Sequence, residues 1–127
     1  MKPQASCQGR GIFLTKKPEQ IEPEMKCVVQ KYLTNPFLID RLKFDLRIYV
    51  LFASADPLKI FMYEDGLVRF CAVPYEKPTN KNMKNTNQHL TNYAINKNHS
   101  DFEENDDSDN EGIGNKRSIS WLWEHLE

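Results

Sequence analysis

The sequence has little of what marks several common classes of protein. Its 127 residues include three cysteines, Cys7, Cys27 and Cys71, with no C-x-x-C pair, and three histidines. An odd number of widely spaced cysteines argues against a disulfide framework, and too few histidines lie near them to predict a zinc site. A reducing cytosol is the compartment that fits this cysteine usage best.

Long apolar runs and a phosphate-binding P-loop are also lacking. Met1 is followed at once by Lys2-Pro3, and no later run is long enough for a signal peptide or a membrane span. The five glycines do not form a Walker pattern. We therefore expect neither export nor a membrane partner, and any nucleotide site must be of another kind.

The acidic residues are unevenly placed. Seven of the 18 lie between Asp101 and Glu111, where there is no lysine or arginine, so the rest of the chain has 17 basic residues against 11 acidic ones and a net charge of +6. A cationic body suits an anionic ligand such as a nucleotide, or an acidic protein tail. Ordinary solvated surface charge explains the same composition equally well.

Short, turn-bounded segments rich in Ile, Val, Phe and Tyr predict β-strands between Ile12 and Ala72. The strongest pattern is strand, turn, strand, turn, strand, which predicts an antiparallel meander. Its strands are expected at 44–53, 60–63 and 67–73, with turns at Asp56-Pro57 and at Glu64-Asp65-Gly66. Earlier strands are expected at 12–15, after Gly9-Arg10-Gly11, and at 27–33, before the break at Asn35-Pro36.

The chain beyond residue 75 is mostly polar. We expect a surface loop over 76–88, a semi-apolar stretch at 89–97, and disorder over 98–117, where there is almost nothing to bury. A Ser118 cap followed by apolar residues predicts the start of a helix, with Trp121, Leu122 and Leu126 on one face. So short a helix needs a partner surface. Trp121 and Trp123 are expected to pack as core or interface residues.

One strand carries a cationic face. Because side chains two apart in a strand point the same way, Lys43, Asp45 and Arg47 share one face. Arg47 could supply bidentate donors, and Lys43 a compact charge, to an anion such as a triphosphate. The alternative is a solvated outer face with cross-strand ion pairs.

Two further motifs are weaker alone. Lys2-Pro3 followed by Gln8-Gly9-Arg10-Gly11 could clamp phosphates, because glycine lets backbone N–H groups approach closely, although two glycines can also form a simple turn. His89-Leu90-Thr91-Asn92-Tyr93 offers an imidazole, a hydroxyl and a carboxamide that could bind phosphate oxygens or an amine. A capped turn is the alternative there.

Taken together in order and spacing, these motifs resemble the tubulin tyrosine ligase-like family. The stretches that carry the resemblance are Lys2-Pro3, 8–11, 29–33, 43–47, 63–70 and 89–97. Gln8 to Gly11, Asn35 to Asp40 and Tyr93 to Lys97 are similar to its polyglutamylase branch. The resemblance implies an α/β (α+β) chain with a partial ATP-grasp fold over 1–97, a disordered acidic loop over 98–117, and a helix start over 118–127.

The resemblance also implies a chemistry. Such an enzyme would use ATP to phosphorylate a carboxylate on a tubulin tail, and the amine of free glutamate would then attack the acyl phosphate. The residues implied in ATP binding are Lys2, Gln8, Gly9, Arg10, Gly11, Gln30, Lys31, Tyr32, Leu33, Lys43, Asp45 and Thr91, and those implied in catalysis are Arg47, Arg69 and Asn92. Clustered donors suit a reaction between anions, because they offset charge in the transition state.

The partners implied are ATP, glutamate and tubulin or microtubule tails, without nucleic acid, in the cytoplasm on the cytoskeleton, including a cilium or basal body. Magnesium is implied too, but the family's Asp and Glu-x-Asn ligands are expected beyond Glu127, so no metal ligand is assigned and the chain alone is expected to be inactive. Arg41 departs from the family, which often has glycine there. The alternatives are an inactive remnant that binds nucleotide or tubulin weakly, and a purely structural β-meander.

Overall fold

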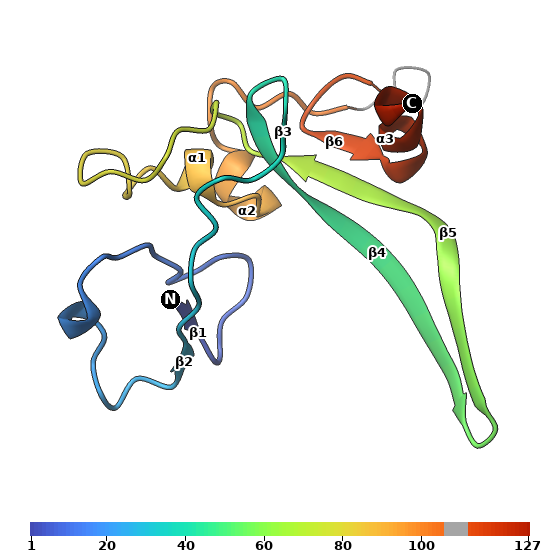
Figure 1. Cartoon of the computed structure of the whole chain (residues 1–127), viewed down its shortest axis with the longest axis horizontal. Helices are drawn as coiled ribbons and strands as arrows, with labels where there is room; N and C mark the ends of the chain where they lie inside the picture. Colours follow the sequence, from blue (N-terminus) through green and yellow to red (C-terminus); the bar gives the residue numbers. More distant parts are fainter. Residues whose placement is uncertain (106–111) are drawn as a thin grey trace.

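The computed structural model describes residues 1–105 and 112–127. It is a mixed α+β fold built on antiparallel strands, as the sequence predicts (Figure 1). The strands are β1 (Lys2–Pro3), β2 (Cys27–Val28), β3 (Leu38–Ile39), β4 (Leu42–Ala55), β5 (Leu58–Phe70) and β6 (Lys116–Ser118). The helices are a 3-10 turn at Pro18–Gln20, α1 (Thr86–His89), α2 (Tyr93–Asn96) and α3 (Ile119–Leu126).

The N-terminal part, residues 1–37, contains less strand than the sequence predicts. β1 and β2 form a two-stranded antiparallel pair in which Pro3 lies opposite Cys27. Only the first two residues of the expected strand 27–33 are in a sheet, because β2 pairs with Lys2 and Pro3 alone. The expected strand at 12–15 is wrong, because this run pairs only at Phe13, whose N–H donates to the Met1 carbonyl at 3.3 Å.

The sheet is antiparallel in the order β3-β4-β5-β6, but the second and third strands expected in the meander are a single strand, β5. β4 and β5 pair along almost their whole length, and the turn at Asp56-Pro57 is confirmed. The second turn, at Glu64-Asp65-Gly66, is wrong, because these residues lie inside β5. Gly66 pairs with Ile48 and Met62 with Val50, so three residues of β5 stand opposite one of β4 in a bulge.

The lack of a side chain at Gly66 makes this bulge possible. A Cβ there would overlap the Arg47 carbonyl oxygen and approach Ile119. The neighbouring Asp65 carboxylate accepts N–H groups from Gly66 at 2.7 Å and from Ile119 at 3.0 Å. The acidic-glycine motif therefore joins β5 to the start of α3 instead of reversing the chain.

The turn before β4 explains the departure at Arg41. Ile39 pairs with Leu42, which leaves Asp40 and Arg41 as a two-residue loop with φ of 51° and 65°. Both residues are in the left-handed region that such a hairpin turn requires and that favours glycine.

Part of the segment expected to be disordered is ordered. Lys116–Ser118 forms β6 on the edge of β5, and the N–H of Phe70 donates to the backbone carbonyl of Asn115 at 2.8 Å. The buried Asn115 side chain donates to the Cys71 carbonyl, so a polar side chain helps to fix this segment. The acidic residues between 106 and 111 lie outside the described residues.

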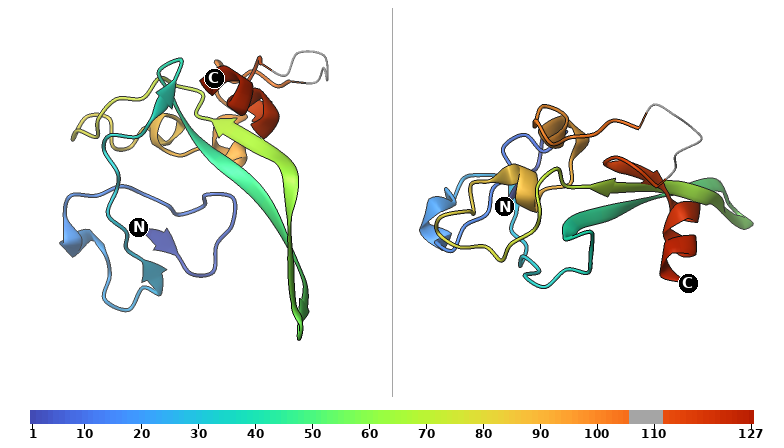
Figure 2. Two further views of the ribbon diagram at one scale, coloured as in Figure 1. Left: turned by 45° about the vertical axis from the view of Figure 1, so that its right-hand side comes forward. Right: turned by 90° about the horizontal axis from the view of Figure 1, so that it is seen from above.

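The helix start predicted at Ser118 is confirmed, and its partner surface is β5. The Ser118 hydroxyl accepts the Trp121 N–H at 2.9 Å. Helix α3 packs on one face of the base of the hairpin (Figure 2). The buried core there consists of Ile39, Val68, Phe70, Ile119 and Leu122, with Trp121 against it, while Trp123 is 56% exposed and Leu126 is 48% exposed.

Helices α1 and α2 lie between the N-terminal part and the base of the hairpin (Figure 1). The loop expected over 76–88 is shorter than predicted, because α1 begins at Thr86. Beyond the base, the hairpin projects away from the rest of the chain and its apolar side chains are mostly exposed. None of the helices in the described residues is both long and apolar enough to cross a membrane.

Candidate functional site

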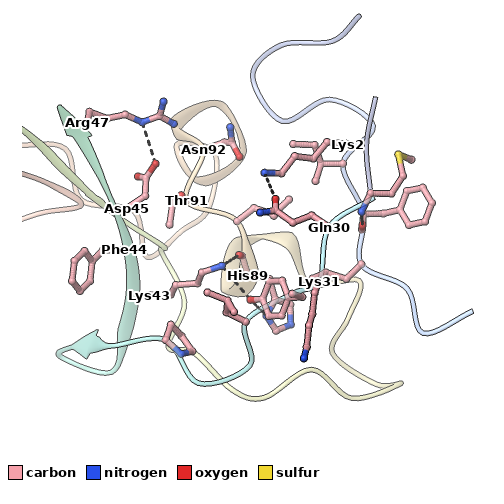
Figure 3. A pocket seen from close by; sticks show the side chains of 18 residues that line it. Lys2, Gln30, Lys31, Lys43, Phe44, Asp45, Arg47, His89, Thr91 and Asn92 are labelled. Atoms are coloured by element: carbon pink, nitrogen blue, oxygen red, sulfur yellow. Dashed lines mark hydrogen bonds and ion pairs between the residues drawn. The ribbon is translucent and has the colours of Figure 1, made fainter. Parts of the chain in front are cut away.

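A cleft of about 560 Å³ lies where the N-terminal part, the start of β4 and the segment between α1 and α2 meet. This volume is in the range of small-molecule sites. Ten residues that the sequence predicts for the site line it: Lys2, Gln30, Lys31, Tyr32, Leu33, Lys43, Asp45, Arg47, Thr91 and Asn92. Segments up to 90 residues apart in sequence thus converge on one cavity (Figure 3).

The remaining predicted residues lie outside the cleft lining. Gly9 packs beneath it, since a Cβ there would lie 2.5 Å from Ile95 and 3.1 Å from Asn92. Its φ of +82° and this close approach both require glycine. Arg10 borders a separate shallow depression, and the structure places neither Gln8 nor Gly11 in the cleft wall.

Lys43 is the most firmly held cation of the cleft. Its Nζ donates to the His89 carbonyl at 2.7 Å and to the Tyr32 hydroxyl at 3.2 Å. It also lies 4.6 Å from the centre of the Tyr32 ring. Burial lowers the pKa of this ammonium, and nearby Lys2 acts in the same direction. A bound anion would relieve both effects.

Lys2 reaches the same space from the N-terminal part, with its Nζ 3.1 Å from Gln30 Oε1 (Figure 3). Lys31 extends away from these two cations in the same view. Hence Lys2 and Lys43 form a cationic wall that the side chain of Lys31 does not join.

Asp45 lies between two arginines. Arg69 donates to both carboxylate oxygens, at 3.0 and 2.7 Å, from the opposing strand. Arg47 contacts the same carboxylate from its own strand, with Nε at 3.0 Å. Burial raises the pKa of the Asp45 carboxyl, and Arg47 and the Thr91 hydroxyl oppose that rise. The cationic face and the cross-strand ion pair are therefore both present.

The two arginines differ in access. The Arg47 side chain is 46% exposed and lines the cleft, whereas that of Arg69 is 17% exposed and does not line it. Arg69 reaches the site only through Asp45, so its catalytic role remains a prediction.

An apolar wall completes the cleft. Its members are Met1, Ile12, Phe13, Leu14, Leu33, Pro36, Phe44 and Leu90. The sequence predicts a strand at 12–15 and no part for it in the site, although an apolar run directly after a glycine loop is a usable signal. Because cationic and apolar side chains both line it, the cleft suits a ligand that joins a flat base to an anionic chain.

The sequence offers the His89 imidazole as a group that could bind phosphate oxygens or an amine, but the family resemblance does not include it among the residues implied in ATP binding. It is fully buried, and its Nδ1 lies 3.3 Å from the Tyr32 hydroxyl. Burial lowers the pKa of its imidazole, and Lys43 acts in the same direction.

The described residues do not fit a metal ion. In 1–105 and 112–127, no group of three or more His, Cys, Asp and Glu side chains is arranged to hold one. Asp45, the carboxylate of the cleft, is already engaged by two guanidinium groups.

Comparison with known proteins identifies the family. All 127 residues match the Tubulin-tyrosine ligase family. The chain belongs to this family. Membership confirms the resemblance drawn from the ordered motifs, and with it the mixed α+β fold of partial ATP-grasp type.

Several curated relatives of this family member carry the name tubulin polyglutamylase. The chain is 51% identical over 128 residues to "Tubulin polyglutamylase TTLL13" of Mus musculus. This match covers 98% of the chain and 15% of that protein. It is 48% identical over 126 residues to "Tubulin polyglutamylase ttll6" of Danio rerio, covering 99% and 16%. It is 48% identical over 127 residues to "Probable beta-tubulin polyglutamylase" of Tetrahymena thermophila, covering 100% and 11%. The chain thus spans a small part of each relative.

Proposed function

We propose that the cleft binds ATP, and that the protein contributes this site to an ATP-dependent ligase that adds glutamate to tubulin tails. The observation that carries the proposal is the joining of a cationic wall and an apolar wall in one cleft of about 560 Å³. The names of the relatives support tubulin as the substrate and polyglutamylation as the reaction.

Lys2 and Lys43 are the residues that would hold the phosphates. Two of the three N–H donors of Lys43 are used by Tyr32 and His89, which leaves one for a phosphate oxygen. Bound ATP would supply the phosphoryl group that activates a tail carboxylate as an acyl phosphate. The lysines would offset the negative charge that accumulates when two anions are brought together.

Arg47, Thr91 and Asn92 would act on the substrate side. Arg47 is exposed at the cleft and oriented by Asp45, so its fork can bind a carboxylate. Thr91 and Asn92 offer a hydroxyl and a carboxamide to an incoming amine or a ribose. No step is assigned to magnesium, because the described residues do not form a site for it. The site of action would be the cytoskeleton, including a cilium or basal body.

A segment exchange tests this function. The matched residues of the Mus musculus polyglutamylase would be replaced by this chain, and ATP-dependent transfer of labelled glutamate to tubulin would be measured. We expect the exchanged protein to retain transfer and Lys43→Met within it to lose at least about tenfold, since a charge-assisted contact to phosphate is removed. A folded exchanged protein without transfer, or one indifferent to Lys43→Met, would contradict the proposal.

A further inference from the structure

We propose that His89 is a positioning residue for Lys43, acting through the Tyr32 hydroxyl and through its own carbonyl so that one N–H of Lys43 faces the cleft. The inference rests on the proposed function in one respect: the anion that this N–H would meet is the phosphate chain of ATP. The orientation of Lys43 itself is a property of the free protein.

Burial excludes direct contact between the imidazole and a ligand. His89 has 0% exposed surface, and its ring is enclosed edge-on by Tyr32 and Tyr75 at 5.8 and 5.9 Å between ring centres. Whatever His89 does for a ligand in the cleft, it does through its neighbours. The neighbours through which it can affect a ligand are Tyr32 and Lys43, because both line the cleft.

The hydrogen bonds around Lys43 have a defined direction. An ammonium has donors only, so the Tyr32 oxygen and the His89 carbonyl both accept from it. The Tyr32 proton must then go to another atom. His89 Nδ1, 3.3 Å from the Tyr32 oxygen, is placed to accept it when that nitrogen carries no proton.

Tyr75 does not compete with Lys43 in this network. Its hydroxyl donates to the Thr34 carbonyl at 2.9 Å, so toward Tyr32 it is an acceptor, and it shares with His89 Nδ1 the role of receiving the Tyr32 proton. A protonated His89 Nδ1 would be different, because its N–H would compete with Lys43 for the Tyr32 oxygen. An unprotonated Nδ1 therefore keeps the Tyr32 oxygen available to Lys43, and the lysine is held at two fixed points.

The experiment compares three variants of the chain with ATP and with adenosine, which lacks the phosphates. His89→Phe keeps a ring in the buried space but removes Nδ1, His89→Asn restores an acceptor near the Nδ1 position, and Tyr32→Phe removes the linking hydroxyl. Tyr93→Phe is the matched control, since its hydroxyl bonds Glu104 away from Lys43. Calorimetry gives the affinities, and NMR order parameters report the mobility of the Lys43 ammonium without nucleotide.

We expect His89→Phe and Tyr32→Phe to mobilise the Lys43 ammonium and to weaken ATP about tenfold, the scale of one hydrogen bond to a charged group. His89→Phe should change the affinity for adenosine by less than about twofold, and His89→Asn should recover most of the ATP affinity. Equal losses for ATP and adenosine in His89→Phe, or an unchanged Lys43, would overturn the inference. If His89→Phe does not fold, His89→Leu, which also lacks an acceptor, decides by the mobility of Lys43.

The two proposals can fail separately. The wild-type chain could fail to bind ATP and yet hold Lys43 rigid until His89 is replaced. That result would contradict the ATP site but support the positioning role of His89. A chain that binds ATP through Lys43 regardless of His89 would do the reverse.

Discussion

At the scale of residues, the position of Asp45 decides what the two arginines can do. The alternation of side chains in a strand predicts that Lys43, Asp45 and Arg47 share a face, and all three line the cleft. The position of Arg69 was beyond sequence reasoning. The outer register, Leu51 opposite Phe61, would continue to Leu67 opposite Asp45, and only the bulge brings Arg69 there.

Replacing each arginine by methionine should separate their roles. Arg69→Met should lower the free energy of unfolding by about 1–3 kcal/mol, because a half-buried carboxylate loses a bidentate partner. Arg47→Met should cost less than about 1 kcal/mol, since the pair is more exposed, but should weaken ATP binding. Urea unfolding and calorimetry on both variants check this, and equal effects on stability would contradict it.

The buried His89 predicts a pH dependence of stability. Its pKa in the folded chain lies below the ordinary value of 6.5, because burial disfavours the charged ring. As the pH falls below about 6.5 the unfolded chain binds a proton that the folded chain does not, so the free energy of unfolding should decrease until the folded-state pKa is passed. Urea unfolding between pH 7.5 and 5.0 should show a smaller decrease for His89→Phe than for the wild type.

At the scale of elements, the sequence predicted types of structure better than connections. The hairpin turn at Asp56-Pro57, the strands around it and the capped helix at Ser118 are local patterns and were predicted correctly. The bulge at Asp65-Gly66 was not, because an acidic-glycine pair reads as a turn unless the partner strand and α3 are known. β6 was missed for the same reason, since its backbone bonds and the Asn115 side chain, rather than its composition, hold it.

Asp65 should stabilise α3 from outside the helix. Its carboxylate accepts the N–H groups of Ile119 and Ser120, at 3.0 and 3.2 Å, and hydrogen bonds from Gly66 and these two residues lower its pKa. Asp65→Ala should therefore cost about 1 kcal/mol, as for other lost helix caps. Glu64→Ala, in the same bulge, is the control. Thermal unfolding of the two variants should differ, and similar midpoints would argue against the cap.

A substitution at Arg41 should increase the stability of the fold. Its φ of 65° places an L side chain in the left-handed region, which is strained for any residue but glycine. Arg41→Gly should raise the free energy of unfolding by about 1 kcal/mol. Lys97→Gly, an exposed change outside this turn, should not stabilise. Urea unfolding that showed no gain for Arg41→Gly would mean that the arginine side chain compensates for the strain.

At the scale of the whole molecule, the site depends on contacts that no single motif predicts. Family resemblance supplied the motifs, and folding brings Lys2, Gln30, Lys43 and Asn92 to one cleft. The apolar wall and the network of Lys43, Tyr32 and His89 come from tertiary packing alone. The presence of cationic and apolar side chains in one cleft is the basis of the proposed ATP site.

Calorimetric titration of the chain with ATP tests that claim most directly, with Lys43→Met as the test variant and Lys59→Met, at the hairpin tip, as the control. We expect one ATP per chain, an affinity lowered at least about tenfold by Lys43→Met, and no change with Lys59→Met. Absence of binding by the folded wild-type chain, or equal affinities for all three proteins, would contradict it.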